Sequence, residues 1–128
     1  WIEVTTGGNY TLVDGTRLLL EGFYNGRGEW DAPYSTSSWL SRFSGSRRTL
    51  GKAIVVGNVT RPFGQLWQLG VSTVGNVGDQ SMVVIPSIAY SFAENVDLMF
   101  NGLLYVGEDG TEFGAGNYGG FVRGRVYF

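Results

Sequence analysis

The fold is decided by residues 80–107, which read QSMVVIPSIAYSFAENVDLMFNGLLYVG. Apolar residues alternate with small or polar ones in Gln80–Phe92, and the same alternation returns in Val96–Gly107. A period of two is typical of a β-strand whose two faces differ. The residues between the two blocks, Ala93-Glu94-Asn95, are typical of a tight turn. This stretch therefore predicts two neighbouring antiparallel strands.

The same alternation extends toward both ends of the chain. Further blocks are Trp1–Val13, Arg17–Asn25, Lys52–Phe63, Leu66–Val77 and Gly120–Phe128. No window of eleven or more residues has helical periodicity, so we expect seven strands and no helix. No composition shift divides the chain, and we expect residues 1–128 to form a single β-sheet unit.

The composition excludes several classes of protein. The 128 residues include 21 Gly, 15% aromatic residues and 16% charged residues, with no Cys and no His. Without Cys there is no disulfide framework and no thiolate metal site, and without His there is no His-based triad or zinc hydrolase. The net charge of −2 does not favour nucleic-acid binding. No nucleophile–base pair is evident, so we expect no enzyme, no cofactor and no metal site.

The connections between the blocks alternate in length. Asp14–Thr16, Phe63–Gln65 and Ala93–Asn95 are short, whereas Asn25–Gly51 is long and Asp109–Gly119 is intermediate. Only Val77–Asp79 is short where a long connection is expected. Short turns at one rim and longer loops at the other are typical of outer-membrane β-barrels. No run of about 18 apolar residues is present, so a transmembrane helix is not expected.

The less apolar face of the predicted strands carries charges. They are Arg17, Glu21, Asp97, Arg123 and Arg125. In a membrane barrel the apolar face contacts lipid, so these charges line the lumen and select ions or solutes. The alternative is a salt-bridge lattice that fills a narrow barrel. Alternation alone does not exclude a soluble barrel with its apolar face inward, although aromatic residues at the block ends favour the interfaces of a membrane.

The end of the chain carries a specific resemblance. Residues 119–128 read GGFVRGRVYF and place Val122, Val126 and the terminal Phe128 on one face. This segment resembles the C-terminal insertion signal of Gram-negative outer-membrane β-barrels, and residues 82–113 resemble the last strands of bacterial porin-like barrels. The resemblance implies an antiparallel up-and-down transmembrane barrel in the bacterial outer membrane. It also implies contact with outer-membrane lipid and recognition by the barrel assembly machinery during insertion.

The strand count bears on closure of this barrel. Bacterial single-chain barrels have an even number of strands, and seven is odd. We therefore expect the chain to be the C-terminal part of a larger even-stranded barrel, completed by its own remaining strands or by another chain.

Two loops carry further candidates. Arg27, Arg42, Arg47 and Arg48 lie in the long loop, where they could contact lipopolysaccharide phosphates, constrict a pore or contact a partner; the alternative is a plain solvated loop. Residues 108–112 are rich in acidic side chains but lack the ligand spacing of a calcium loop, so a solvated turn is expected.

These features predict a porin-like channel for passive solute passage. Two alternatives remain. One is a non-conducting outer-membrane anchor or scaffold for a partner protein, and the other is a soluble calycin-like barrel that binds a small ligand.

Overall fold

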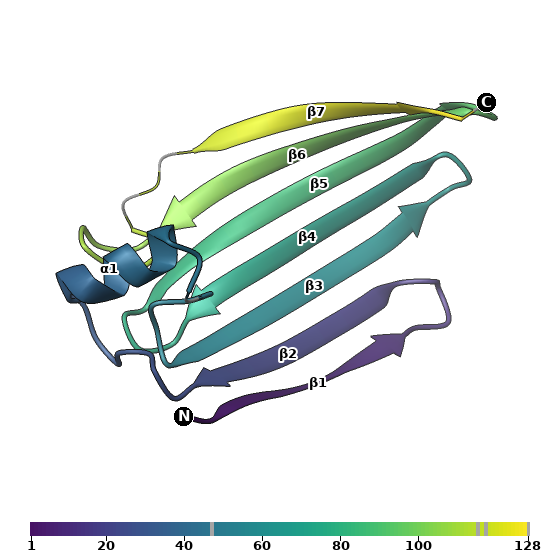
Figure 1. Cartoon of the computed structure of the whole chain (residues 1–128). Helices are drawn as coiled ribbons and strands as arrows, with labels where there is room; N and C mark the ends of the chain where they lie inside the picture. Colours follow the sequence, from purple (N-terminus) through teal and green to yellow (C-terminus); the bar gives the residue numbers. More distant parts are fainter. Residues whose placement is uncertain (47, 115, 117, 128) are drawn as a thin grey trace.

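The computed structural model describes residues 1–46, 48–114, 116 and 118–127. Within these ranges the chain forms seven β-strands and one short helix (Figure 1). The elements are β1 Glu3–Thr11, β2 Arg17–Asn25, α1 Thr36–Phe43, β3 Ala53–Phe63, β4 Trp67–Asn76, β5 Ser81–Ala93, β6 Val96–Val106 and β7 Gly119–Val126. The predicted strand blocks are thereby confirmed, with ends that differ by one or two residues.

The strands form one antiparallel up-and-down sheet in the order β1-β2-β3-β4-β5-β6-β7. Each strand pairs with its neighbour in sequence, including β2 and β3, which the long loop joins. The sheet is open, with β1 and β7 as its two edge strands. The all-β, up-and-down prediction is confirmed, whereas the described residues do not close into a barrel by themselves.

The register gives the sheet two different faces. Two residues directly opposite each other in an antiparallel pair of strands lie on the same face of the sheet. The residues on each face can therefore be identified by following these pairs from one strand to the next. Ile88 pairs with Phe100, and Phe100 pairs with Val122. The apolar face defined in this way contains Val4, Tyr10, Leu18, Leu20, Tyr24, Val55, Val59, Trp67, Leu69, Val71, Met82, Val84, Ile88, Tyr90, Leu98, Phe100, Leu104, Val122 and Val126. The opposite, polar face contains Arg17, Glu21, Asn58, Thr60, Gln68, Ser72, Ser87, Ser91, Asp97, Asn101, Arg123 and Arg125.

The apolar face is open to the surroundings. Ile88 is 41% exposed, Phe100 45% and Val122 65%. Among the described residues, the buried apolar side chains are Tyr34, Leu50, Ile54 and Val83. Ile54 and Val83 belong to the polar side of the sheet near its loop-bearing end. The small buried core therefore lies between that end of the sheet and the loops, and the apolar face contributes nothing to it.

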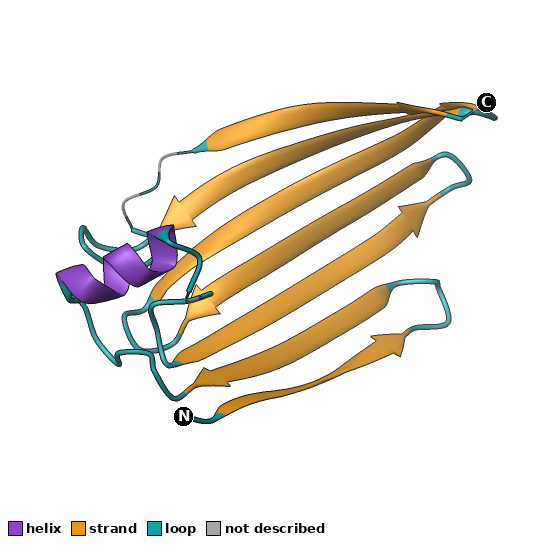
Figure 2. Ribbon diagram, in the orientation of Figure 1, coloured by secondary structure: helices purple, strands orange, loops and turns teal. Residues whose placement is uncertain are grey.

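The expectation of no helix is wrong. Thr36–Phe43 forms α1 inside the long loop (Figure 2). Ser35 caps this helix, because its side chain accepts a hydrogen bond from the Ser38 amide at 3.3 Å. Eight residues make about two turns, which is too short for a period of 3.6 to be recognised in the sequence. Within the described ranges, no helix has the length and apolar character needed to cross a membrane.

The two ends of the sheet differ. We call the end that carries residues 26–46, 48–52, 77–80 and 107–114 the loop rim, and the end that carries the three short turns the turn rim. The first residue lies at the loop rim, and β7 ends at the turn rim (Figure 1). The predicted alternation of short and long connections is therefore confirmed, including the short connection at 77–80.

Candidate functional site

All five charges predicted for a lumen lie on the polar face, but the structure brings only three of them together. Asp97 of β6 is the cross-strand partner of Arg125 in β7, and Arg123 lies opposite Met99. Arg17 and Glu21 lie on β2, separated from this group by β3, β4 and β5. Of the five predicted charges, Asp97, Arg123 and Arg125 are therefore the ones that lie close together.

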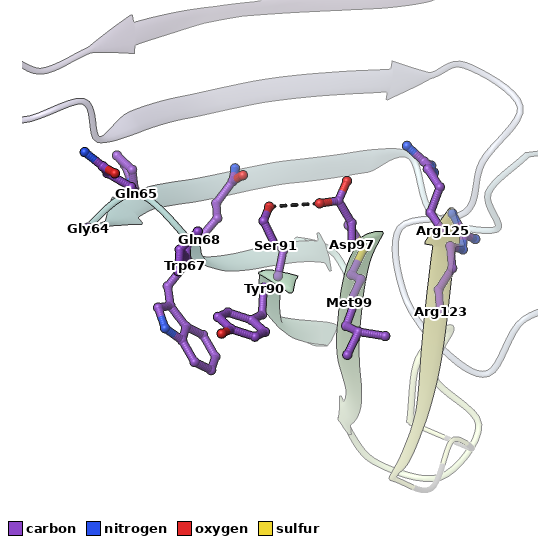
Figure 3. A pocket seen from close by; sticks show the side chains of 14 residues that line it. Gly64, Gln65, Trp67, Gln68, Tyr90, Ser91, Asp97, Met99, Arg123 and Arg125 are labelled. Atoms are coloured by element: carbon purple, nitrogen blue, oxygen red, sulfur yellow. Dashed lines mark hydrogen bonds between the residues drawn. The ribbon is translucent and has the colours of Figure 1, made fainter. Parts of the chain in front are cut away.

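These three side chains line a pocket of about 280 Å³ at the turn rim, which we call the turn-rim pocket. Its polar lining includes Gln68 and Ser91. Figure 3 shows Gln68, Ser91 and Asp97 projecting to one side of the sheet and the rings of Trp67 and Tyr90 to the other. Those two rings stack on the apolar face with centroids 4.3 Å apart.

Hydrogen bonds hold two of the three charges. The Ser91 hydroxyl donates to Asp97 Oδ1 at 2.8 Å (Figure 3). Arg125 Nη1 donates to the Tyr127 hydroxyl at 3.2 Å. Within the described residues the Arg123 side chain has no hydrogen bond or ion pair, and the five charges form no ion pair with one another. The salt-bridge lattice is therefore not formed in the open sheet.

A second group of polar residues lies at the loop rim and locks the loops onto the sheet. We call it the loop cap, consisting of Glu29, Tyr34, Arg42, Leu50, Gly51, Asn76, Asp79, Ser81 and Glu112. Asn76, the last residue of β4, is its link to the sheet, because Asn76 Nδ2 donates to the Tyr34 hydroxyl at 2.6 Å and to Glu112 Oε2 at 3.0 Å. Two loops that are distant in sequence are thereby joined at one side chain.

Glu112 is the central acceptor of the loop cap. Its carboxylate accepts hydrogen bonds from the Leu50 amide at 2.9 Å and the Gly51 amide at 3.0 Å, and it forms an ion pair with Arg42. Glu112 is 7% exposed and Leu50 is fully buried. The solvated turn expected at 108–112 is therefore wrong for Glu112. Its carboxylate replaces the water that two buried backbone amides would otherwise need.

Asp79 holds the other side of the loop cap. Its carboxylate accepts hydrogen bonds from the Tyr34 hydroxyl at 2.6 Å, the Ser81 hydroxyl at 2.6 Å and the Glu112 amide at 2.7 Å. Burial alone raises the pKa of this carboxyl, but these hydrogen bonds outweigh it and the pKa lies below its usual value. Burial, together with the neighbouring Asp79, raises the pKa of Tyr34. Tyr34 is therefore a hydrogen-bond donor throughout the physiological range.

Glu29 fixes the start of α1. Its carboxylate accepts hydrogen bonds from the Ser35 amide at 3.2 Å and the Ser35 hydroxyl at 2.8 Å, and it also accepts one from the Ser38 hydroxyl. A carboxylate at a helix N-terminus satisfies amides that have no partner within the helix. Glu29 thus anchors the start of α1 within the described part of the long loop.

The four arginines predicted for the long loop have different environments. The Arg27 guanidinium lies 3.2 Å from the ring centroid of Trp1, and Arg42 is the partner of Glu112. Arg48 is exposed, and Arg47 lies outside the described residues. Of the predicted insertion signal, Val122 and Val126 lie exposed on the apolar face, and Phe128 lies outside the described residues.

Sequence reasoning missed Glu29, Tyr34, Asp79 and Glu112. One local signal was present at Asp79, whose spacing to Ser81 is typical of a carboxylate that bonds the backbone two residues on. The other contacts join residues that are far apart in sequence, and no pattern predicts them. Comparison with known proteins found no matching family model, curated protein or solved structure.

The lowered pKa of Asp79 predicts acid sensitivity of the loop cap. Because the pKa is lower in the folded state than in the unfolded chain, this carboxylate stabilises the cap above its unfolded value of about 3.8. That contribution is lost as the pH falls through the folded pKa. The Glu112 amide, which donates to Asp79, should report this titration in an NMR experiment from pH 7 to pH 2. We expect a midpoint below 3.8 and no such transition in Asp79→Asn, whereas a midpoint at or above 3.8 would contradict the assigned hydrogen bonds.

Proposed function

We propose that this chain is part of an integral β-barrel of the bacterial outer membrane that acts as a porin-like channel for passive solute passage. The observation that carries the proposal is the exposed apolar face, to which all seven strands contribute side chains. A soluble protein rarely leaves so large an apolar surface open to water, whereas lipid requires one. Five charged side chains, Arg17, Glu21, Asp97, Arg123 and Arg125, lie on the opposite face, where a lumen would be, whereas Arg61 lies on the apolar face at the turn rim.

The two edge strands support a larger barrel. In lipid every backbone amide and carbonyl needs a partner, so a sheet with free edges is not stable there. β1 and β7 run in the same direction, because six antiparallel pairings separate them. An all-antiparallel barrel therefore needs an odd number of further strands between them. We propose that these come from the remaining strands of the same barrel or from another chain.

The proposed barrel also has two expected partners, the lipid of the outer membrane and the barrel assembly machinery. The apolar face contacts outer-membrane lipid, and the C-terminal sequence with Val122, Val126 and Phe128 is the segment that the barrel assembly machinery recognises. The loop cap lies on the polar side of the sheet, since it is bonded to Asn76 beside the buried Ile54. In a closed barrel it would narrow the mouth of the lumen at the loop rim.

Conductance tests the proposal directly. The full-length protein that contains this chain should insert into planar bilayers from detergent and produce stepwise increases in current. Stable insertion without current would favour the anchor. A protein that stays monomeric without detergent and binds a small apolar ligand would favour the soluble barrel and overturn the proposal.

One observation favours the anchor as a second candidate. At the loop rim Leu40 is 69% exposed and Phe43 is 80% exposed on α1. Exposed apolar side chains at a helix surface are typical of a protein contact. A partner docked on α1 would account for them without any passage of solute.

A further inference from the structure

The turn-rim pocket combines two guanidinium groups with one carboxylate. Arg123 and Arg125 alternate with Gly124 on β7, so both lie on the polar face, and Asp97 is the acidic side chain in the pocket lining. The pocket therefore has an excess of one positive charge. Among the described residues that line it, no second carboxylate is present to balance this charge.

The hydrogen bond of the Asp97 carboxylate is directed away from Arg123. Asp97 Oδ1 accepts from Ser91, which is on β5, whereas β7 lies on the other side of β6. Arg125 is partly held by Tyr127. Arg123 has no bonding partner among the described residues, and its guanidinium retains its donors for a ligand. An Arg guanidinium prefers a planar acceptor with two oxygens.

The space beside Arg123 is bounded by small or flexible residues. Gln68 pairs with Ala89, Ala89 pairs with Met99, and Met99 pairs with Arg123, so these four side chains form one row across the polar face. Ala89 and Met99 separate the Gln68 amide from Arg123. This row gives a ligand a cation at one end, an amide donor at the other and an apolar floor between them.

We propose that the turn-rim pocket binds a small anionic solute through a carboxylate or phosphate group held by Arg123 and Arg125. The inference rests on the proposed channel, because it names the chemical class of the solute that passes. It requires no metal and no cofactor, only charge-assisted hydrogen bonds from two guanidinium groups.

Titration with inorganic phosphate and with succinate tests the pocket. The protein is held in detergent micelles at low ionic strength, and the arginine side-chain NMR signals are followed. We expect both probes to shift the signals of Arg123 and Arg125 and Arg123→Gln to weaken binding about tenfold or more, as the loss of a charged hydrogen-bond donor implies. Arg123→Lys keeps the positive charge but loses the paired N–H donors of the guanidinium. Its affinity for the probes should lie between those of the wild type and Arg123→Gln.

Arg61→Gln is the matched control. Arg61 lies at the same rim but on the apolar face, opposite Leu69, and its own partner is Asp14 at 3.8 Å. Its removal should leave the affinity for both probes unchanged. Equal weakening in Arg61→Gln, or unchanged affinity in Arg123→Gln, would overturn the pocket. A response to only one probe would support the pocket and identify the group it binds.

The conductance measurement keeps the two proposals apart. If the protein conducts no current but Arg123→Gln still loses anion binding, the pocket stands and the channel fails. If the protein conducts but neither anion binds, the channel stands and the pocket is overturned. If it conducts and binds, a salt gradient should show anion preference that Arg123→Gln reduces.

Discussion

Glu112→Ala is expected to release the loop cap at a cost of roughly 2–5 kcal/mol to its local stability, because the Glu112 carboxylate is the buried acceptor on which four donors converge. The side chain of Glu112 is fully buried, whereas that of its partner Arg42 is about one-third exposed. The variant also leaves the Leu50 and Gly51 amides without an acceptor in a dry environment. The loss is larger than for any exposed charge of the chain, where a single pair contributes about 0–1 kcal/mol.

Hydrogen exchange measures this effect. The Leu50 and Gly51 amides should be strongly protected in the wild type and should exchange faster in Glu112→Ala by a factor of about a hundred or more. Glu108→Ala is the matched control, since Glu108 lies in the same loop with its side chain exposed. If the two variants exchanged at the same rate, the loop cap would not depend on Glu112.

Phe100→Arg is expected to reduce the stability of the lipid-inserted protein by about 2–4 kcal/mol, the cost of an arginine on the lipid face near the bilayer midplane. Phe100 lies in the middle of β6 on the apolar face and is 45% exposed. Its neighbour Asn101 lies on the polar face, opposite Ser87. Asn101→Arg should cost much less, because in the proposed barrel a long arginine side chain on the polar face can extend its guanidinium into the hydrated lumen.

Urea titration of folding into lipid vesicles compares the two variants. A wild-type midpoint for Asn101→Arg together with a clearly lower midpoint for Phe100→Arg is the expected result. The opposite order would mean that the apolar and polar faces have been assigned to the wrong environments.

The strands were predictable because each carries its own signal. The alternation in 80–107 is long enough to show both faces, and every further block repeats it. The assignment of Arg17, Glu21, Asp97, Arg123 and Arg125 to one face follows from the same period of two. The pairing of Asp97 with Arg125 could not be predicted from this period. It depends on the register between β6 and β7, which is set by all the residue pairs of the two strands together.

The loop cap was not predictable for a related reason. Glu112 bonds Leu50, which is 62 residues earlier, and Asp79 bonds Tyr34, which is 45 residues earlier. A carboxylate in a loop has the same local sequence whether it is solvated or buried. α1 was missed because two turns give too few apolar positions to show a helical period. The strands of the sheet could therefore be predicted from the sequence, whereas only part of the candidate site could be.

Cysteine scanning along β6 tests most directly whether the apolar face contacts lipid. The chain has no native Cys, so each single-Cys variant from Val96 to Val106 carries one label site. In vesicles, labels at Leu98, Phe100 and Leu104 should be quenched by lipid-attached quenchers, and labels at Met99, Asn101 and Leu103 by water-soluble ones. The contradicting result is that lipid-attached quenchers do not quench the labels at Leu98, Phe100 and Leu104, while water-soluble quenchers do quench those at Met99, Asn101 and Leu103. The apolar residues would then lie inside the protein and not in lipid.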